Sequence, residues 1–540
     1  MAKLVTDDMR DLKTPDDVII RAEARKPETD PTLGVGVQVN REGTPRHRLV
    51  TIGDSLTQGF QSGAIFNTQI SFPALIAREM GWTEFRYPTY NTPGDGLPLN
   101  LERLVRELEQ KVGDRIDVWN FIPTLLFLRN YLDKLEDYWE RGEGAILPSQ
   151  KEINHNLGVY GWDLRNILSR NASSCQELMS RKIPREDVFR QLVDYHNERA
   201  ALRVLNSSVR SQTGETLTPL QAATALGAEG MPENGDGDGI ETLIMMIGSN
   251  NALGSLLTFK IAWSDEGYDD MEINDRYTIW RPIHFKAELD KVVAEVKQIR
   301  ARHVIWATVP HVTIAPFARG VDTKVRKDSR YFPYYTLPWV SDAGFNQDRH
   351  PNLTAPEVRA IDSAIDQYND CIIDAVRKAR TEGRDWYLFD LAGLLDRLAQ
   401  RRYIESPRAR PSWWKEIGGE YQLPSQLQKL DPKPDSRFSL SDATGRKQGG
   451  LFSLDGIHPT TIGYGIMAQE LIAIMQTAGV EFYDDRGNLR QGKVEIDFQQ
   501  LIEQDTLISN PPKAFENYFQ AISWIDRYLS VFGNLLKSNY

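Results

Sequence analysis

The chain has 540 residues, of which 41% are hydrophobic, and its formal net charge is −11. This acidic balance, without a basic cluster, excludes a nucleic-acid-binding protein and gives no reason for attraction to anionic membranes. The first residues lack the apolar stretch of a signal peptide, and no run approaches the length of a transmembrane helix. We therefore expect a cytoplasmic protein, or a secreted one if a signal segment has been removed.

The N-terminal part predicts an arm followed by a buried strand. Residues 1–46 are polar and contain prolines, which indicates an arm lying over the following domain. Arg48–Gly53 is an apolar, β-branched run, and Asp54-Ser55-Leu56 follows it. A serine hydroxyl at the carboxyl end of a first strand lies where open α/β sheets bind ligands. An ordinary turn is the alternative interpretation of Gly-Asp-Ser.

Two stretches that follow are interpreted as insertions. Residues 81–150 include the apolar run 118–128 and a helical pattern, which predict either a lid or acyl-chain wall, or a helical pair packed on the core. The packed pair is favoured. In the second insertion, 173–235, the segment Ser173 to Ala225 is helical and polar in pattern and has no assigned function. The acidic, glycine-rich residues 232–239 lack the final glutamate of a calcium loop, which favours an acidic loop without metal.

Four further apolar runs complete the predicted sheet. They are Glu152–Tyr160, Leu243–Gly248, His303–Val309 and Trp386–Leu391. Helical stretches lie between them, and this alternation predicts an α/β fold with a parallel sheet.

The aromatic insertion 315–350 is open to two interpretations. Its segment 331–339 combines aromatic residues with two prolines, so a regular helix is not expected. Such a loop can line a pocket or seal the edge of the core.

The histidines outside the last motif show no metal-ligand spacing; for His155 and His311 a structural role is favoured over a place at the site.

A second motif stands near the C-terminus. Asp455-Gly456-Ile457-His458-Pro459 precedes a helical pattern from Thr460 to about Met475. An Asp-Gly turn would let the Asp455 carboxylate reach the ring of His458, and would leave the other ring nitrogen to take a serine proton. Coincidence is the alternative for a single Asp-x-x-His.

Together these segments resemble the GDSL, or SGNH, family of serine hydrolases. Residues 52–59 match the first block, Asp455–Pro459 the last, and residues 246–251 the third, with Asn251 where the family usually has Asp. The resemblance implies Ser55 as nucleophile, His458 as base and then acid, and Asp455 as the residue that orients it. Its oxyanion hole would be the Ser55 N–H, the Gly161 N–H and the Asn250 amide.

The glycine of the second block has two candidates. Gly161 is preferred because a predicted strand precedes it and a predicted helix starts at Asp163. Gly94 lies at the more usual distance after the first block.

The resemblance also implies a fold and an activity. The fold is a three-layer, flavodoxin-like α/β/α sandwich with about five parallel strands, spanning residues 47–480 with insertions at about 81–150, 173–235 and 315–350. The activity is carboxylic ester hydrolysis without metal or organic cofactor, on a small-molecule, lipid or carbohydrate ester. The alternatives are an acyltransferase using the same site, and a catalytically idle scaffold acting as a binding protein.

The remaining features concern the C-terminal extension, 481–540, and the two cysteines. Apolar residues at helical spacing between 514 and 536 predict an amphipathic helix that packs on its own domain or on a second copy of the chain. Cys175 and Cys371 could pair, but free buried thiols are favoured in so long a chain.

Overall fold

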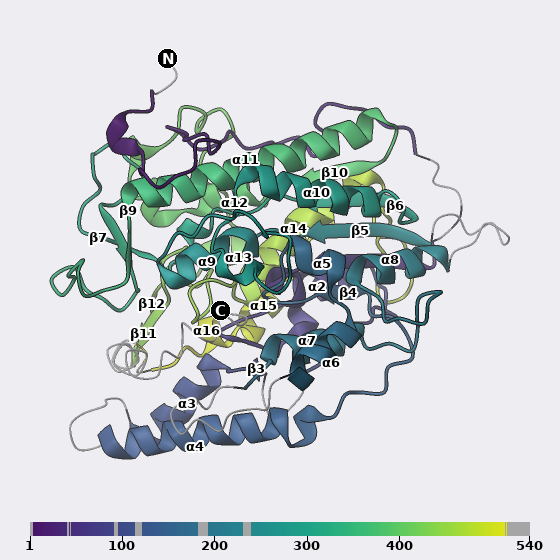
Figure 1. Ribbon diagram of the computed structural model, residues 1–540, viewed down its shortest axis with the longest axis horizontal. Helices are drawn as coiled ribbons and strands as arrows, with labels where there is room; N and C mark the ends of the chain where they lie inside the picture. Colours follow the sequence, from purple (N-terminus) through teal and green to yellow (C-terminus); the bar gives the residue numbers. More distant parts are fainter. Residues whose placement is uncertain are drawn as a thin grey trace.

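A five-stranded parallel sheet forms the centre of the computed structural model (Figure 1), which describes residues 4–39, 43, 45–90, 96–113, 121–181, 193–229, 239–513 and 515. The strands in chain order are β1 (His47–Gly53), β4 (Asn156–Gly158), β5 (Ile240–Met246), β6 (Ala301–Ala307) and β10 (Trp386–Phe389). Their order across the sheet is β10-β6-β5-β1-β4, and every pairing is parallel. Counted by appearance, this order is 2-1-3-4-5, which is that of flavodoxin-like sheets.

All five strands expected from the sequence are present, and one is much shorter than predicted. Every residue of β5 is buried, as in a strand covered on both faces. The predicted strand 152–160 is reduced to the three residues of β4. The N–H groups of His155 and Asn156 donate to the carbonyl of Arg86, at 2.8 and 3.1 Å, while the His155 carbonyl accepts from Thr51 N–H of β1 at 2.9 Å, so this segment divides its hydrogen bonds between the sheet and the chain at Arg86.

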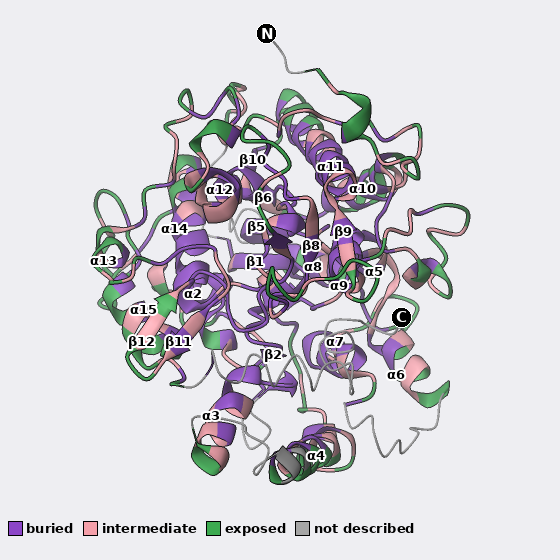
Figure 2. Ribbon diagram, turned by 90° about the vertical axis from the view of Figure 1, so that its left-hand side faces the viewer, coloured by how far each residue is buried: buried purple, intermediate pink, exposed green. Residues whose placement is uncertain are grey.

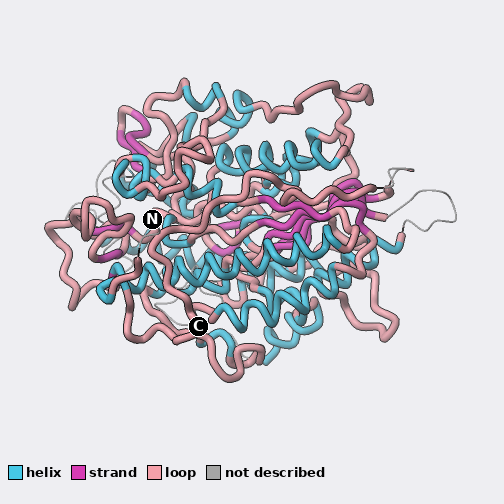
Figure 3. The backbone as a smooth tube through the Cα atoms, turned by 90° about the horizontal axis from the view of Figure 1, so that it is seen from above, coloured by secondary structure: helices cyan, strands magenta, loops and turns pink. Residues whose placement is uncertain are grey.

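Helices cover both faces of the sheet, and Figure 3 shows it edge-on between them. The α-helices are α1 (Ser55–Gln58), α2 (Phe72–Glu79), α3 (Leu101–Val112), α4 (Phe121–Glu140), α5 (Leu164–Ser169), α6 (Ala172–Arg181), α7 (His196–Leu205), α8 (Pro219–Ala228), α9 (Asn250–Thr258), α10 (Pro282–Val296), α11 (Ala355–Thr381), α12 (Leu391–Leu398), α13 (Ser425–Gln428), α14 (Thr461–Ala478), α15 (Phe498–Gln504) and α16 (Thr506–Ser509). α2 and α14 pack on one face, and α5, α8, α10 and α11 on the other (Figure 2). The chain is therefore an α/β protein with a three-layer arrangement.

The N-terminal residues lie along α11, at the top of Figure 1. The backbone N–H of Arg21 donates to Ser363 Oγ at 3.0 Å, and the Arg25 guanidinium pairs with Asp390 at 2.6 Å. Because Asp390 is the N-cap of α12, this arm is tied to the start of that helix.

The first insertion packs on a second apolar cluster. Leu108 of α3 and Leu132 and Trp139 of α4 are buried in it together with Phe60, which follows α1. Residues 114–120 of this insertion lie outside the described part, as do Gly94, residues 230–238 of the acidic loop, and residues 514 and 516–540 of the predicted C-terminal helix.

The aromatic insertion forms a small antiparallel sheet instead of a helix. Its strands are β7 (Arg319–Val321), β8 (Tyr334–Thr336) and β9 (Asn352–Thr354). Phe332 and Tyr335 are buried between this sheet and the main body.

Both cysteines are free, as favoured from the sequence, although only Cys175 is buried and Cys371 is half-buried. Within the described ranges, no helix combines the length and the apolar character needed to cross a bilayer.

Candidate active site

The register of the sheet aligns the ends of three neighbouring strands. Gly53 at the end of β1 pairs with Gly158 of β4 on one side and with Met246 of β5 on the other. The segments that follow carry Ser55, Gly161 and Asn250. Because the strands are parallel, these segments leave the sheet at the same edge, beside the point where the chain reverses its direction across the sheet.

Ser55 begins the short helix α1. The preceding Asp54 caps this helix, and its Oδ1 accepts a hydrogen bond from Leu56 N–H at 3.0 Å. Ser55 is 6% exposed. The serine is thus held by a strand-to-helix turn at the edge of the sheet, as the sequence predicted.

Ser55, His458 and Asp455 form a continuous hydrogen-bonded chain. His458 Nε2 lies 2.9 Å from Ser55 Oγ, and His458 Nδ1 lies 3.0 Å from Asp455 Oδ2. An ionised Asp455 requires the proton on Nδ1, which leaves Nε2 free to accept the serine proton. The three residues come from opposite ends of the sequence, and their geometry is that of a nucleophile, its base and the group that orients the base.

The turn that carries His458 is shaped around the Asp455 carboxylate. Gly456 has φ of +69°, and a Cβ there would lie 2.7 Å from the Phe438 ring, so this turn requires glycine. Asp455 Oδ1 accepts from the N–H groups of Ile457 and His458 at 2.8 and 2.9 Å, and Oδ2 accepts from Gly63 N–H at 3.0 Å.

These donors decide the ionisation of Asp455. Burial alone would raise the pKa of the buried Asp455 carboxyl, but His458 and the backbone N–H donors lower the pKa below its ordinary value. The carboxylate is therefore ionised at neutral pH, in the state that orients His458.

The two other expected oxyanion-hole residues lie next to each other. Gly161 has φ of +76° and stands in the turn after β4. Asn250 Nδ2 donates to the carbonyl of Trp162 at 2.7 Å, which ties the start of α9 to that turn. An amide group carries two hydrogens, so this bond leaves a second one for another acceptor. The same turn is tied to α1, because Tyr160 N–H donates to Gln58 Oε1 at 2.7 Å.

Asp54, beside Ser55, is a buried acid in an unusual state. Oδ2 of its carboxyl has no hydrogen-bond partner within the described residues. Burial raises the pKa of Asp54 to about 6. The sequence assigned Asp54 to the motif and gave no indication of this shift.

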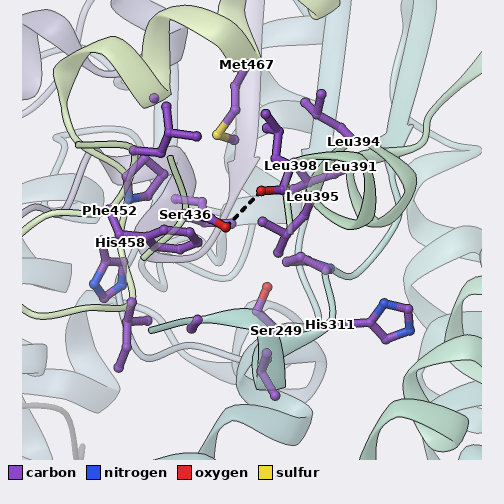
Figure 4. A pocket seen from close by; sticks show the side chains of 18 of the residues that line it. Ser249, His311, Leu391, Leu394, Leu395, Leu398, Ser436, Phe452, His458 and Met467 are labelled. Atoms are coloured by element: carbon purple, nitrogen blue, oxygen red, sulfur yellow. Dashed lines mark hydrogen bonds between the residues drawn. The ribbon is translucent and has the colours of Figure 1, made fainter. Parts of the chain in front are cut away.

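An apolar cavity of about 110 Å³ adjoins Ser55 and His458 (Figure 4). Four leucines of α12 line one side of it, with Phe452 across from them and Met467 above (Figure 4); these leucines are Leu391, Leu394, Leu395 and Leu398. The sequence motifs around Ser55 and His458 do not include this helix. The signal was present, because leucines at spacings of three and four residues follow the last strand, and this pattern predicts one apolar helical face.

The histidines outside this chain of three are held by other contacts. His311 borders the cavity, but its two ring nitrogens lie 3.1 Å from Asp366 and Asp396, whose charges outweigh its burial and raise its pKa to about 10. His155 Nδ1 accepts from Arg86 N–H at 2.9 Å, and its Nε2 lies 3.0 Å from a ring nitrogen of His47. Burial lowers the pKa of His155 to about 2. Neither histidine has a free ring nitrogen for acid–base work.

Among the described residues neither a metal-ligand cluster nor a match to a known protein adds to this picture of the site. Within the described residues, no group of three or more His, Cys, Asp and Glu side chains is placed to hold a metal ion. No protein-family model matches the chain, no curated protein matches it, and no solved structure matches it.

Proposed function

We propose that the chain is a serine hydrolase of the SGNH type that cleaves carboxylic esters through an acyl-enzyme on Ser55. The observation that carries the proposal is the Ser55–His458–Asp455 chain, with bonds of 2.9 and 3.0 Å, at the wall of an apolar cavity. The strand order and the position of the serine after the first strand agree with the fold implied by the resemblance.

The proposed reaction has two halves. Ser55 Oγ attacks the ester carbonyl while its proton moves to His458 Nε2, and the carbonyl oxygen becomes an oxyanion. The N–H groups of Ser55 and Gly161 and the free amide hydrogen of Asn250 would donate to that oxygen. His458 then gives its proton to the leaving alcohol. In the second half, His458 takes a proton from water, which attacks the acyl-enzyme and releases the acid as the proton returns to Ser55 Oγ.

The cavity supports an apolar acyl group. Its polar lining residues are Ser55, His458, Ser249, His311 and Ser436; the rest of its described lining is aliphatic, aromatic, methionine, proline or glycine. Its position beside Ser55 is suited to the acyl chain of the substrate, because burial of that chain contributes binding energy in proportion to its apolar area.

Ester turnover tests the proposal. Wild-type protein should hydrolyse p-nitrophenyl acetate, butyrate or octanoate, and Ser55→Ala should reduce kcat/KM by at least about a thousandfold. Ser425→Ala, on the exposed start of α13, is the matched control and should retain wild-type turnover. Equal turnover by Ser55→Ala and wild type would exclude Ser55 as the nucleophile.

A further inference from the structure

A second pocket, of about 350 Å³, lies beside the apolar cavity and is rich in arginine. It is bounded by the aromatic insertion and by the π-helical turn Gln400–Ile404 that follows α12. Ser436 lines both this pocket and the apolar cavity, so the two share a wall. We name the second space the arginine pocket.

Five arginines and a single carboxylate line the arginine pocket, counted over the described residues. They are Arg319, Arg330, Arg401, Arg402, Arg437 and Glu405. Three of the arginines are neutralised by carboxylates outside the lining, in the pairs Arg319–Asp342, Arg402–Asp362 and Arg437–Asp435, at 2.6, 2.8 and 2.6 Å.

The other two arginines keep unused donors. Arg330 is buried, and two of its nitrogens donate to the hydroxyls of Tyr331 and Tyr403, at 2.8 and 3.3 Å, while its Nη2 has no partner within the described residues. The Arg401 guanidinium lies 4.5 Å from the centroid of the Phe332 ring, and in the described part of the chain it makes no side-chain hydrogen bond or ion pair. A guanidinium nitrogen that is removed from water without an acceptor is costly, and this applies to the buried Nη2 of Arg330. Arg401 is half-buried and keeps its unpaired donors at the pocket wall, where an anion can accept them.

The charges around the arginine pocket also favour an anion. Burial, followed by the charges of Arg402 and Arg401, lowers the pKa of the neighbouring Lys324 to about 7. Glu405 offsets part of this field, but it is 3.6 Å from Arg437, with which it pairs. The described lining therefore carries more positive charge than Glu405, its one carboxylate, neutralises.

We propose that the arginine pocket binds an oxyanion group, phosphate or carboxylate, through the donors of Arg401, with the buried Arg330 adding positive charge at the pocket wall. The planar fork of a guanidinium matches two oxygens of such a group, and the Phe332 ring holds the Arg401 fork in place. A volume of about 350 Å³ is within the range of sites for small organic molecules, so the anion is the acidic group of a larger ligand. The free inorganic ion is the other source of the same chemistry.

Calorimetric titration with inorganic phosphate and with phenyl phosphate tests the site. Wild-type protein should bind both, and phenyl phosphate should bind more tightly if the ligand is organic; equal affinities would assign the site to the free ion. Arg401→Gln should weaken phosphate binding at least about tenfold, and Arg401→Lys should weaken it less, because the charge remains and the fork is lost.

The controls keep folding and catalysis apart from binding. Arg408→Gln changes an exposed arginine that does not line the pocket and should leave both affinities unchanged. Arg401→Gln and Arg330→Gln should each bind phosphate weakly while their near-UV circular dichroism stays that of the wild type. No binding by folded wild type, or wild-type affinity in Arg401→Gln, would overturn the proposal. No turnover is measured, so the result does not depend on the proposed hydrolysis.

Discussion

The carboxylate of Asp455 joins two distant parts of the chain. It accepts backbone N–H groups of its own turn and of Gly63, and it faces His458 Nδ1. An amide in its place would present an NH₂ group either to Gly63 N–H and the His458 ring or to the N–H groups of its own turn. Donors would then face donors, and the ring would lose the partner that fixes its tautomer.

We therefore predict that Asp455→Asn lowers kcat/KM for p-nitrophenyl butyrate by about ten-thousandfold, while the variant still folds. Steady-state kinetics and a urea melt measure the two effects. Asp484→Asn, in an exposed turn, serves as the control and should keep wild-type kinetics. Near-normal turnover in Asp455→Asn would remove Asp455 from the mechanism.

Asp54 predicts a pH dependence of stability. Its pKa of about 6 in the folded chain exceeds the ordinary value of an aspartate, so the folded state holds the proton more tightly than the unfolded state. The contribution of Asp54 to the free energy of unfolding is fully present below about pH 4 and is lost as the pH rises through 6. The free energy of unfolding of the wild type, relative to that of Asp54→Asn, should therefore fall by up to about 3 kcal/mol between pH 4 and 7.

Urea unfolding of the two proteins at several pH values measures this difference. Asn caps helices about as well as Asp, so the substitution should leave α1 in place. A free-energy difference that stays constant from pH 4 to 7 would contradict the raised pKa.

The helix α12 should limit the length of the acyl chain that the apolar cavity accepts. Its residue Leu395 is half-buried and lines the apolar cavity. Leu395→Phe should reduce the volume of that cavity and lower kcat/KM for the octanoate ester at least about tenfold, while acetate hydrolysis changes little. Leu489→Phe, at a position that is 43% exposed, is the matched control. Equal losses for acetate and octanoate would show that the cavity does not hold the acyl chain.

The elements also show what the sequence could and could not predict. All five strands and the turn motifs around Ser55 and Asp455 are local patterns of apolar runs and turn residues, and each was predicted within a few residues. The shortening of β4 involves a contact with Arg86, and the place of α12 in the cavity wall depends on its meeting Phe452 and Met467, which are distant in the sequence. Neither contact can be predicted from the local sequence of β4 or of α12. The arginine pocket likewise joins residues that are far apart in the chain.

At the scale of the whole molecule, the N-terminal arm is held by a buried ion pair. Arg25 Nη2 donates to both oxygens of Asp390, at 2.6 and 2.7 Å, and the two side chains are 8% and 5% exposed. Burial would raise the pKa of Asp390, but Arg25 lowers it below its ordinary value. Removal of the arginine would leave a buried, uncompensated charge at the start of α12.

We predict that Arg25→Ala lowers the free energy of unfolding by roughly 3–5 kcal/mol in urea melts. The neighbouring Lys26 pairs with Glu416 at the surface, with side chains 52% and 65% exposed, so Lys26→Ala should cost only about 0–1 kcal/mol. Similar melts for the two variants would show that the arm contributes little to the stability of the molecule.

Covalent labelling of Ser55 tests the central claim most directly. Folded wild-type protein is treated with a fluorophosphonate, and the adduct is located by peptide mass spectrometry beside Ser55→Ala and His458→Gln. A single adduct on Ser55, absent from Ser55→Ala and strongly slowed in His458→Gln, is the predicted result, because only a serine with a positioned base reacts readily. A folded wild type that forms no adduct, or forms it on another residue, would contradict the assignment of Ser55 as an activated nucleophile.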